Sequence, residues 1–143
     1  MTKARYATLA TVATDAAAAQ ARIVDPLAPD ADFTVWVATN PATRKVAEVR
    51  KSGHATLLYF DAAALEYVTL VGTATVVTSA AEKPLHWKRE WDPFYAKGPS
   101  SADVVLLRIQ PLRLEVVSPS RKIVNDTVRW RPPTVQFGPP KRK

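Results

Sequence analysis

Apolar residues alternate with smaller or polar ones along much of the chain. Successive side chains of a strand point to opposite faces, so this period of two predicts strands. Residues 33–39 show it clearly, with Phe33, Val35 and Val37 on one face. The segments that we expect as strands are 5–14, 19–25, 33–39, 54–60, 67–78 and 104–117, with a further one at 123–130. Strands outnumber helices and most connections are short, which favours an antiparallel barrel.

Two irregularities interrupt these strands. Gly72 stands in the middle of 67–78 and indicates a bulge, a bend or a close backbone approach. In 104–117 the apolar residues occupy odd positions before Pro111 and even positions after it. A change of face with period two requires a bulge or a bend. We therefore expect the strand to turn a barrel corner at Gln110-Pro111.

The period of the apolar residues changes to that of a helix between the third and fourth strands. We predict a helix over 41–51, with Asn40 as N-cap, Pro41 at the first position and Val46 and Val49 on the buried face. Gly53 is a typical left-handed stop. A second, short helix is expected after the capping-box pattern at Ser79 and to end near Trp91, followed by a loop over 92–101.

Arg44 and Lys45 stand near the start of the predicted helix, where cations oppose the helix dipole. Free N–H groups at a helix N-terminus favour anions, so a bound anion such as phosphate would explain the two cations. The alternative is that both side chains extend into solvent. If the second and third strands pair, Arg22 also approaches this helix start and adds a forked donor.

The net charge of +7 is unevenly distributed. Residues 129–143 hold five basic residues and no acidic one, whereas the remaining 128 hold 15 basic and 13 acidic residues. Such a tail binds polyanions weakly. We therefore expect no specific nucleic-acid partner. The Pro-rich segment 131–143 is expected to be extended or disordered beside a domain over 1–130.

Other kinds of site receive little support. The chain contains no cysteine, which excludes disulfides and thiolate ligands and fits a cytoplasmic protein. No stretch reaches the ~20 apolar residues of a membrane helix, so no membrane association is expected. His54 and His86 are interpreted as surface or packing residues, and no metal site is predicted. An aromatic cluster at Trp87, Trp91, Phe94 and Tyr95 either packs in the core or covers a ligand.

Three elements together resemble the pyridoxamine 5'-phosphate oxidase-like, FMN-binding split-barrel family. Ala38-Thr39-Asn40-Pro41-Ala42-Thr43-Arg44-Lys45 looks like its flavin-phosphate motif. Arg22-Ile23-Val24 looks like its Arg-x-Val element, and Tyr67 to Ala74 resembles its long central strand. The resemblance covers about residues 5–117 and is nearest to small members like the general stress proteins. It implies a mostly β fold, a split β-barrel of about six to seven antiparallel strands with one or two helices.

The resemblance also implies a cofactor site at a homodimer interface. Arg22, Arg44 and Lys45 would hold the FMN phosphate. The ribityl chain and ring would be lined by Ile23, Val24, Ala38 and Thr39. Tyr67 stands where the oxidases have a glutamine that contacts the flavin, a departure that puts this contact in question.

A second departure bears on the reaction. The oxidases carry a Trp and an Arg-Leu-His-Asp element near the last long strand, whereas this chain has Glu115-Val116-Val117 and then residues 121–126 without Trp or His. We therefore expect an FMN-dependent oxidoreductase that transfers hydride or electrons between a donor such as a nicotinamide and a small substrate, not a pyridoxamine phosphate oxidase. The alternatives are a deazaflavin- or haem-binding member of the fold and a flavin-binding module without turnover.

Overall fold

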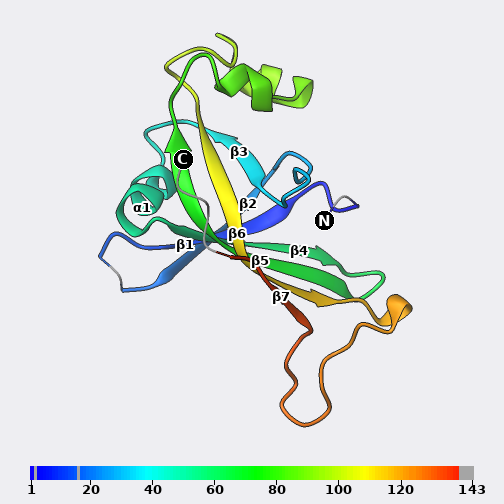
Figure 1. Ribbon diagram of the computed structural model, residues 1–143. Coiled ribbons are helices and arrows are strands. Elements are labelled where there is room, and N and C mark those ends of the chain that lie inside the picture. Colours follow the sequence, from blue (N-terminus) through cyan, green and yellow to red (C-terminus); the bar gives the residue numbers. More distant parts are fainter. Residues whose placement is uncertain (2, 16, 139–143) are drawn as a thin grey trace.

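The structure is a computed structural model that describes residues 1, 3–15 and 17–138. Seven strands form one antiparallel sheet in the order β2-β1-β4-β5-β6-β3, and β7 pairs with the last part of β6 on the same edge as β3 (Figure 1). The strands are β1 (Ala7–Val12), β2 (Ala19–Val24), β3 (Val35–Thr39), β4 (His54–Asp61), β5 (Glu66–Val77), β6 (Val105–Val117) and β7 (Thr134–Gln136). The predicted mostly β split barrel is confirmed, since the sheet curls into a half-barrel.

Helical structure is limited to short pieces. The described part of the chain contains one α-helix, α1 (Arg44–Ser52), which ends at Gly53 in the expected left-handed conformation. It also contains three 3₁₀ turns, η1 (Lys83–His86), η2 (Arg89–Phe94) and η3 (Pro119–Arg121). Among these described elements, no helix is both long and apolar enough to span a membrane.

The curl of the sheet depends on the two long strands β5 and β6. Their register shifts between Val71 and Gly72, where Val71 faces Arg113 but Gly72 faces Pro111. Leu112 is therefore the extra residue of a β-bulge, which confirms the irregularity expected from the apolar pattern. A Cβ on Gly72 would lie 2.3 Å from the carbonyl oxygen of Gln110. Glycine is needed here because the bent backbones approach too closely for a side chain.

The interior of the half-barrel is filled by the apolar face of each strand. Leu9, Leu57 and Leu70 come from neighbouring strands and are fully buried, as are Val46 and Val49 from α1. The helix thus closes one end of the barrel with the face that the sequence predicted. Burying one such side chain stabilises the fold by roughly 1.5–3 kcal/mol.

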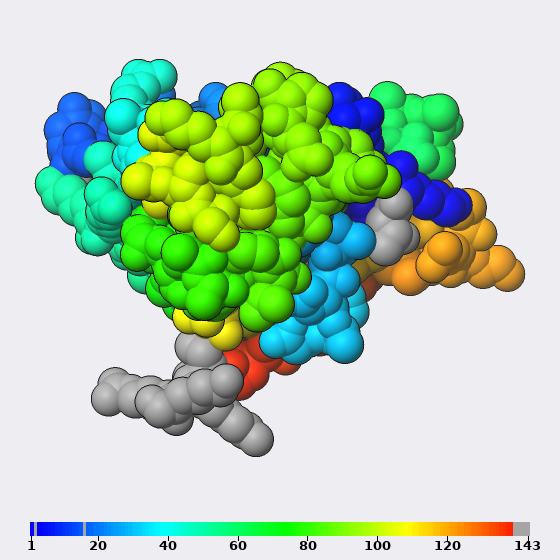
Figure 2. Space-filling view, turned by 90° about the horizontal axis from the view of Figure 1, so that it is seen from above, coloured from blue at the N-terminus to red at the C-terminus, as the bar shows by residue number. Residues whose placement is uncertain are grey.

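The segment between β5 and β6 covers one end of the barrel (Figure 2). The single short helix expected there is wrong. Pro84 and Pro93 cannot donate helical hydrogen bonds, and the segment instead forms η1 and η2. Trp91 packs on Trp36 within a second apolar cluster, and the buried ammonium of Lys83 donates to the carbonyl oxygens of Ser101 and Val104.

The C-terminal part also differs from the expectation. No strand forms over 123–130, which is a loop that projects from the body (Figure 1). Its turn is built by Asp126, whose carboxylate accepts hydrogen bonds from the backbone N–H groups of Val128, Arg129 and Arg131. Within the basic tail, β7 pairs with β6 and Phe137 packs against the core. Residues 139–143 lie outside the described residues.

Candidate functional site

The start of α1 differs from the predicted one and leaves its first turn without a side-chain cap. The helix begins at Arg44 with Thr43 as N-cap, so the assignment of Asn40 and Pro41 is wrong. Asn40 instead closes a turn by accepting the N–H of Ala42 at 2.8 Å. The Thr43 hydroxyl donates to the Asn40 carbonyl oxygen at 2.9 Å, and among the described residues it caps no helix amide. The first turn also contains no acidic residue, so it is open to an external anion.

Lys45 provides a half-buried cation beside this helix start. Its Nζ donates a hydrogen bond of 2.9 Å to the hydroxyl of Thr39, which is itself buried at the end of β3. Among the described residues no carboxylate oxygen lies within 4.0 Å of this ammonium. Burial, and next the charge of Arg22, lower the pKa of Lys45, and the charge of Glu48 offsets part of this effect. A bound anion would relieve both unfavourable contributions.

Arg22 reaches the same place from the opposite edge of the sheet. The sequence analysis expected Arg22 near the helix if β2 paired with β3. These strands do not pair, because they lie at the two ends of the strand order. The side chain nevertheless approaches α1, where its guanidinium forms an ion pair of 2.8 Å with Glu48. It also donates to the hydroxyl of Thr11 and to the carbonyl oxygen of Gln20. The curl of the half-barrel, not strand pairing, therefore brings Arg22 to the helix.

Glu48 and Thr11 are functional-site residues that the sequence did not reveal. The Glu48 side chain is only 4% exposed. Its carboxylate accepts a hydrogen bond of 2.5 Å from the Thr11 hydroxyl and forms the ion pair with Arg22. A carboxylate buried this deeply requires such partners. One signal was available, because Glu48 follows Lys45 by three residues and lies between Val46 and Val49 on the buried side of the helix.

Together these residues form an anion cradle, which we define as Arg22, Thr39, Thr43, Arg44 and Lys45. Arg44 is exposed at the first position of the helix. Three cations against the single carboxylate of Glu48 leave the cradle positively charged. Forked guanidinium donors, an ammonium, hydroxyls and free helix amides are the groups that bind a phosphate.

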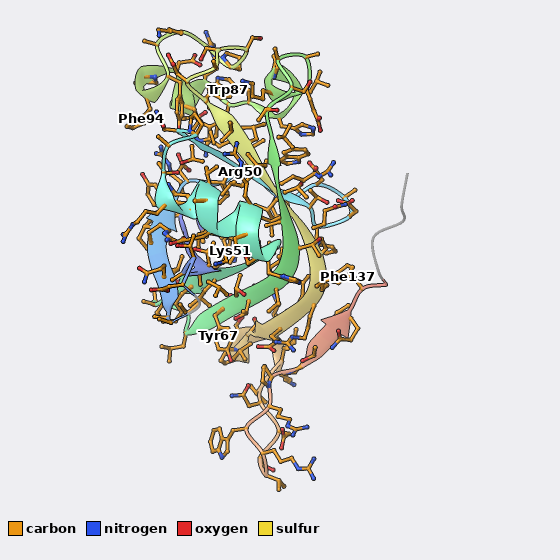
Figure 3. All side chains as sticks on the ribbon, turned by 90° about the vertical axis from the view of Figure 1, so that its left-hand side faces the viewer. Arg50, Lys51, Tyr67, Trp87, Phe94 and Phe137 are labelled. Atoms are coloured by element: carbon orange, nitrogen blue, oxygen red, sulfur yellow. The ribbon has the colours of Figure 1, made fainter. Side chains whose placement is uncertain are left out.

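The other predicted site residues are distributed unevenly around the cradle. Ile23 is 67% exposed beside Arg22, Val24 is buried, and Ala38 is half-buried beside Thr39. Tyr67 is not brought to the cradle. Tyr67 lies at the start of β5 (Figure 3). The end of β5 is the part near the cradle, because Val77 pairs with Leu106 of β6 and the adjacent residue, Val105, pairs with Thr39.

His86 and most of the aromatic cluster at residues 87–95 have packing roles, whereas His54 lies at the surface. His86 stacks on Trp36 with ring centroids 3.6 Å apart, and Trp91 packs edge-on against Trp87. His54 is exposed, and its ring nitrogen lies 2.7 Å from the carbonyl oxygen of Ser52. His86 thus has a packing role and His54 a surface position, the two interpretations that the sequence suggested. Phe94 differs from the rest of the cluster, since it is 77% exposed.

The fold is shared with several solved structures. A protein related to general stress protein 26 of B. subtilis (pyridoxinephosphate oxidase family), from Clostridium acetobutylicum, has a TM-score of 0.77 at 18% identity, over 95% of this chain and 88% of that one. General stress protein 26 from Bacillus anthracis str. Sterne has a TM-score of 0.72 at 17% identity, over 94% and 90%.

A pyridoxamine 5'-phosphate oxidase-related, FMN binding protein from Nostoc punctiforme PCC 73102 has a TM-score of 0.64 at 14% identity, over 94% of this chain and 87% of that one. At these identities the likeness establishes the fold alone. No curated protein matches the chain. The family model described as "Pyridoxamine 5'-phosphate oxidase like" matches residues 1–125, most of the chain. This chain therefore belongs to the pyridoxamine 5'-phosphate oxidase-like family.

Proposed function

We propose that this chain binds FMN through the anion cradle and acts, as a homodimer, as a flavin-dependent oxidoreductase on a small substrate. The observation that carries the proposal is the half-buried ammonium of Lys45. It is held by Thr39 and lies close enough to Arg22 for the two charges to interact. Two cations that repel each other in a partly buried site are stabilised by an anion between them. The match to the family model and the structural neighbour described as an FMN binding protein support flavin phosphate as that anion.

The residues present fit a phosphomonoester. Lys45 would supply a point charge, the free edge of Arg22 and the exposed Arg44 would supply forked donors, and Thr43 would supply a hydroxyl. Glu48 accepts from Nη2 of Arg22, and Thr11 and the carbonyl oxygen of Gln20 accept from Nη1, so the guanidinium is held in place and its Nε side is the one that would face a phosphate. This arrangement is specific for the phosphate and independent of the ring, so it would also accept a deazaflavin.

The edges of the split barrel suit the rest of the cofactor. β2 and β3 end the strand order, so each presents one backbone edge to which no strand of the order pairs. Backbone groups on these free edges, near Ile23 and Val24 in β2 and near Ala38 in β3, are therefore available to the ribityl chain and ring. Tyr67 lies at the far end of β5 from the cradle, so the proposed contact of Tyr67 with a flavin requires the cradle of a second subunit. The proposed Tyr67 contact therefore depends on the proposed homodimer.

Bound flavin would supply the hydride and electron transfer, and the protein would supply position and electrostatics. The cradle would hold the phosphate near the positive helix end, and the sheet edges at β2 and β3 would line the ring. A reduced nicotinamide is the proposed donor, which favours the cytoplasm. Oxidation of pyridoxamine phosphate is not proposed, because the chain lacks the Trp and His that its resemblance to the oxidases would require.

The test compares FMN with riboflavin, which lacks only the phosphate. The double variant Arg44→Ala, Lys45→Ala should weaken FMN binding by roughly 10- to 100-fold, the loss expected for charge-assisted hydrogen bonds worth about 1.5–3 kcal/mol. Riboflavin affinity should change by less than about twofold, because no phosphate contact is lost. Quenching of flavin fluorescence gives both constants. Equal losses for the two flavins would refute the phosphate role.

The matched control is Arg50→Ala, which removes an exposed cation from the same helix (Figure 3). It should leave both affinities unchanged. Absence of flavin binding by the unaltered protein would refute the whole proposal. Sedimentation of the unaltered protein tests the homodimer, and competition between FMN and a deazaflavin identifies the preferred ring.

A further inference from the structure

A cavity lies at the other end of the barrel from the cradle, beside Tyr67 at the start of β5. It has a volume of about 210 Å³ and is bounded by the N-terminal segment, the hairpin between β4 and β5, and the end of β6. Sites for drug-sized ligands usually have volumes of roughly 300–1,000 Å³, so this one suits a smaller molecule. Its apolar walls include Ala4, Val68, Val116, Val117 and Ile123.

One buried polar group in the cavity wall has no partner. Tyr59 lines the cavity and is 3% exposed, and its hydroxyl has no hydrogen-bond partner among the described residues. Burial raises the pKa of Tyr59, so the hydroxyl remains protonated and able to donate. A buried donor without an acceptor costs about 1–3 kcal/mol, and native structures contain few of them. An acceptor oxygen on a ligand in this cavity would satisfy it.

The rim of the cavity carries charges of both signs. Glu66 is fixed there by the hydroxyls of Ser118 and Ser120, which both donate to its Oε1. These two hydrogen bonds, followed by the charges of Lys3 and Arg121, lower the pKa of Glu66 and keep it ionised. Lys3 and Arg121 themselves form no ion pair within the described residues. The rim also carries Asp61 and the N-terminal ammonium of Met1, whose charge interacts with those of Glu66 and Arg121. It thus offers carboxylates for an ammonium and cations for a carboxylate.

We propose that this cavity binds a small zwitterion with an aromatic body, of the class of free amino acids whose ring carries an oxygen. The ammonium would lie against Glu66, the carboxylate against Arg121 and Lys3, and the ring oxygen would accept the hydrogen bond of Tyr59. The apolar walls would enclose the ring. The cradle of the same chain contributes no residue to this cavity, whereas Tyr67, which the proposed function places against the flavin of a second subunit, lines it, so the two proposals share Tyr67.

Four related probes separate the three contacts. L-Tyrosine carries all the groups, L-phenylalanine lacks the ring oxygen, tyramine lacks the carboxylate, and 3-(4-hydroxyphenyl)propanoate lacks the ammonium. Isothermal titration of the full chain without added flavin should give the tightest binding for L-tyrosine. Each other probe should bind about 5- to 20-fold more weakly, as expected for one lost hydrogen bond or charge contact. Equal binding of all four, or binding of none, would overturn the proposal.

Variants test the assignment of each contact. Tyr59→Phe should weaken L-tyrosine binding about 5- to 20-fold and leave L-phenylalanine binding unchanged, since it removes only the donor for the ring oxygen. Its thermal stability without ligand should be unchanged or higher, because an unpaired buried hydroxyl is lost. A clear loss of stability would mean that the hydroxyl has a partner in the free protein, which contradicts the proposal.

Arg121→Gln tests the rim without altering the buried wall. It should weaken L-tyrosine binding about tenfold or more and tyramine binding little, because tyramine has no carboxylate. The control Arg129→Gln removes an exposed cation that does not line the cavity. Lys45→Ala should also leave probe binding unchanged, whereas it weakens FMN binding, so failure of one site is distinguished from failure of the other.

Discussion

The ion pair between Arg22 and Glu48 offers a sharp test of the cradle. In Glu48→Gln the carboxylate charge is removed while an amide oxygen still accepts hydrogen bonds. Removing one partner of a buried pair costs about 3–5 kcal/mol. The side chain of Arg22 is 21% exposed, so solvent compensates part of this loss. We expect the free energy of unfolding to fall by about 1–3 kcal/mol, which lowers Tm by roughly 3–10 °C for a chain of this size.

The same change should improve discrimination for the phosphate. A guanidinium that binds Glu48 on one edge and phosphate on the other separates the two anions by about 6 Å, where unit charges repel by about 3 kcal/mol at an effective dielectric constant of 20. Solvent and salt screen much of this energy. We expect the ratio of FMN to riboflavin affinity to rise about tenfold.

Fluorescence titration of both flavins at two salt concentrations measures this ratio, and thermal unfolding measures stability. Glu90→Gln, an exposed site with the same change of net charge, is the control and should alter neither. If Glu48→Gln loses stability while the affinity ratio stays constant, Arg22 is only a structural partner of Glu48. That outcome would refute its role as a phosphate ligand.

Three further predictions concern the fold and the charge of the cradle. Gly72→Ala places a Cβ 2.3 Å from the Gln110 carbonyl oxygen and should lower the free energy of unfolding in urea by about 2–4 kcal/mol, whereas wild-type stability would show that the bulge adjusts freely. Because the pKa of Lys45 is lower in the folded than in the unfolded chain, stability should rise with pH as the pH approaches 10.5, and Lys45→Met should be more stable at neutral pH and lose this rise. Unfolding curves from pH 7 to 10.5 test whether stability rises with pH. The same slope of stability against pH in Lys45→Met and wild type would contradict this prediction. Phe137→Ala should destabilise by about 1–3 kcal/mol because it packs on the core, while the exposed Val135→Ala should change Tm little, and equal small effects would mean that the tail does not contribute.

Much of the fold was predictable because strand periodicity is a local property. The alternation in 33–39 predicts β3, and the change of face after Pro111 predicts the bulge that bends β6. Predictions were wrong where side-chain oxygens accept hydrogen bonds from backbone N–H groups that a helix or a strand would otherwise bind. Asn40 closes a turn ahead of α1, and Asp126 builds a loop where a strand was expected at 123–130. Such turns compete with helices and strands at little cost and leave only a weak pattern.

The cradle was predictable in part. Lys45 and Arg44 stand next to the helix start in the sequence. Arg22 was assigned through a pairing of β2 with β3 that does not form, and through a family resemblance. The carboxylate that holds Arg22 was missed, because Glu48 lies 26 residues away along the chain. The third member of that network, Thr11, lies 37 residues from Glu48 along the chain. A pairing over such separations exists only once the half-barrel has closed.

The sequence by itself determined the strands, the strand–helix junction and the supply of cations near that junction, because each depends on neighbouring residues. Only the tertiary structure decided how these parts combine. The curl of the sheet brings Arg22 to α1 although β2 and β3 do not pair, and it leaves Tyr67 at the opposite end of β5. It also gives Arg22 a buried counterion, whereas within the described part of the chain Lys45 forms no ion pair. Charge balance in a partly buried site depends on through-space distances, which the order of residues along a chain does not specify.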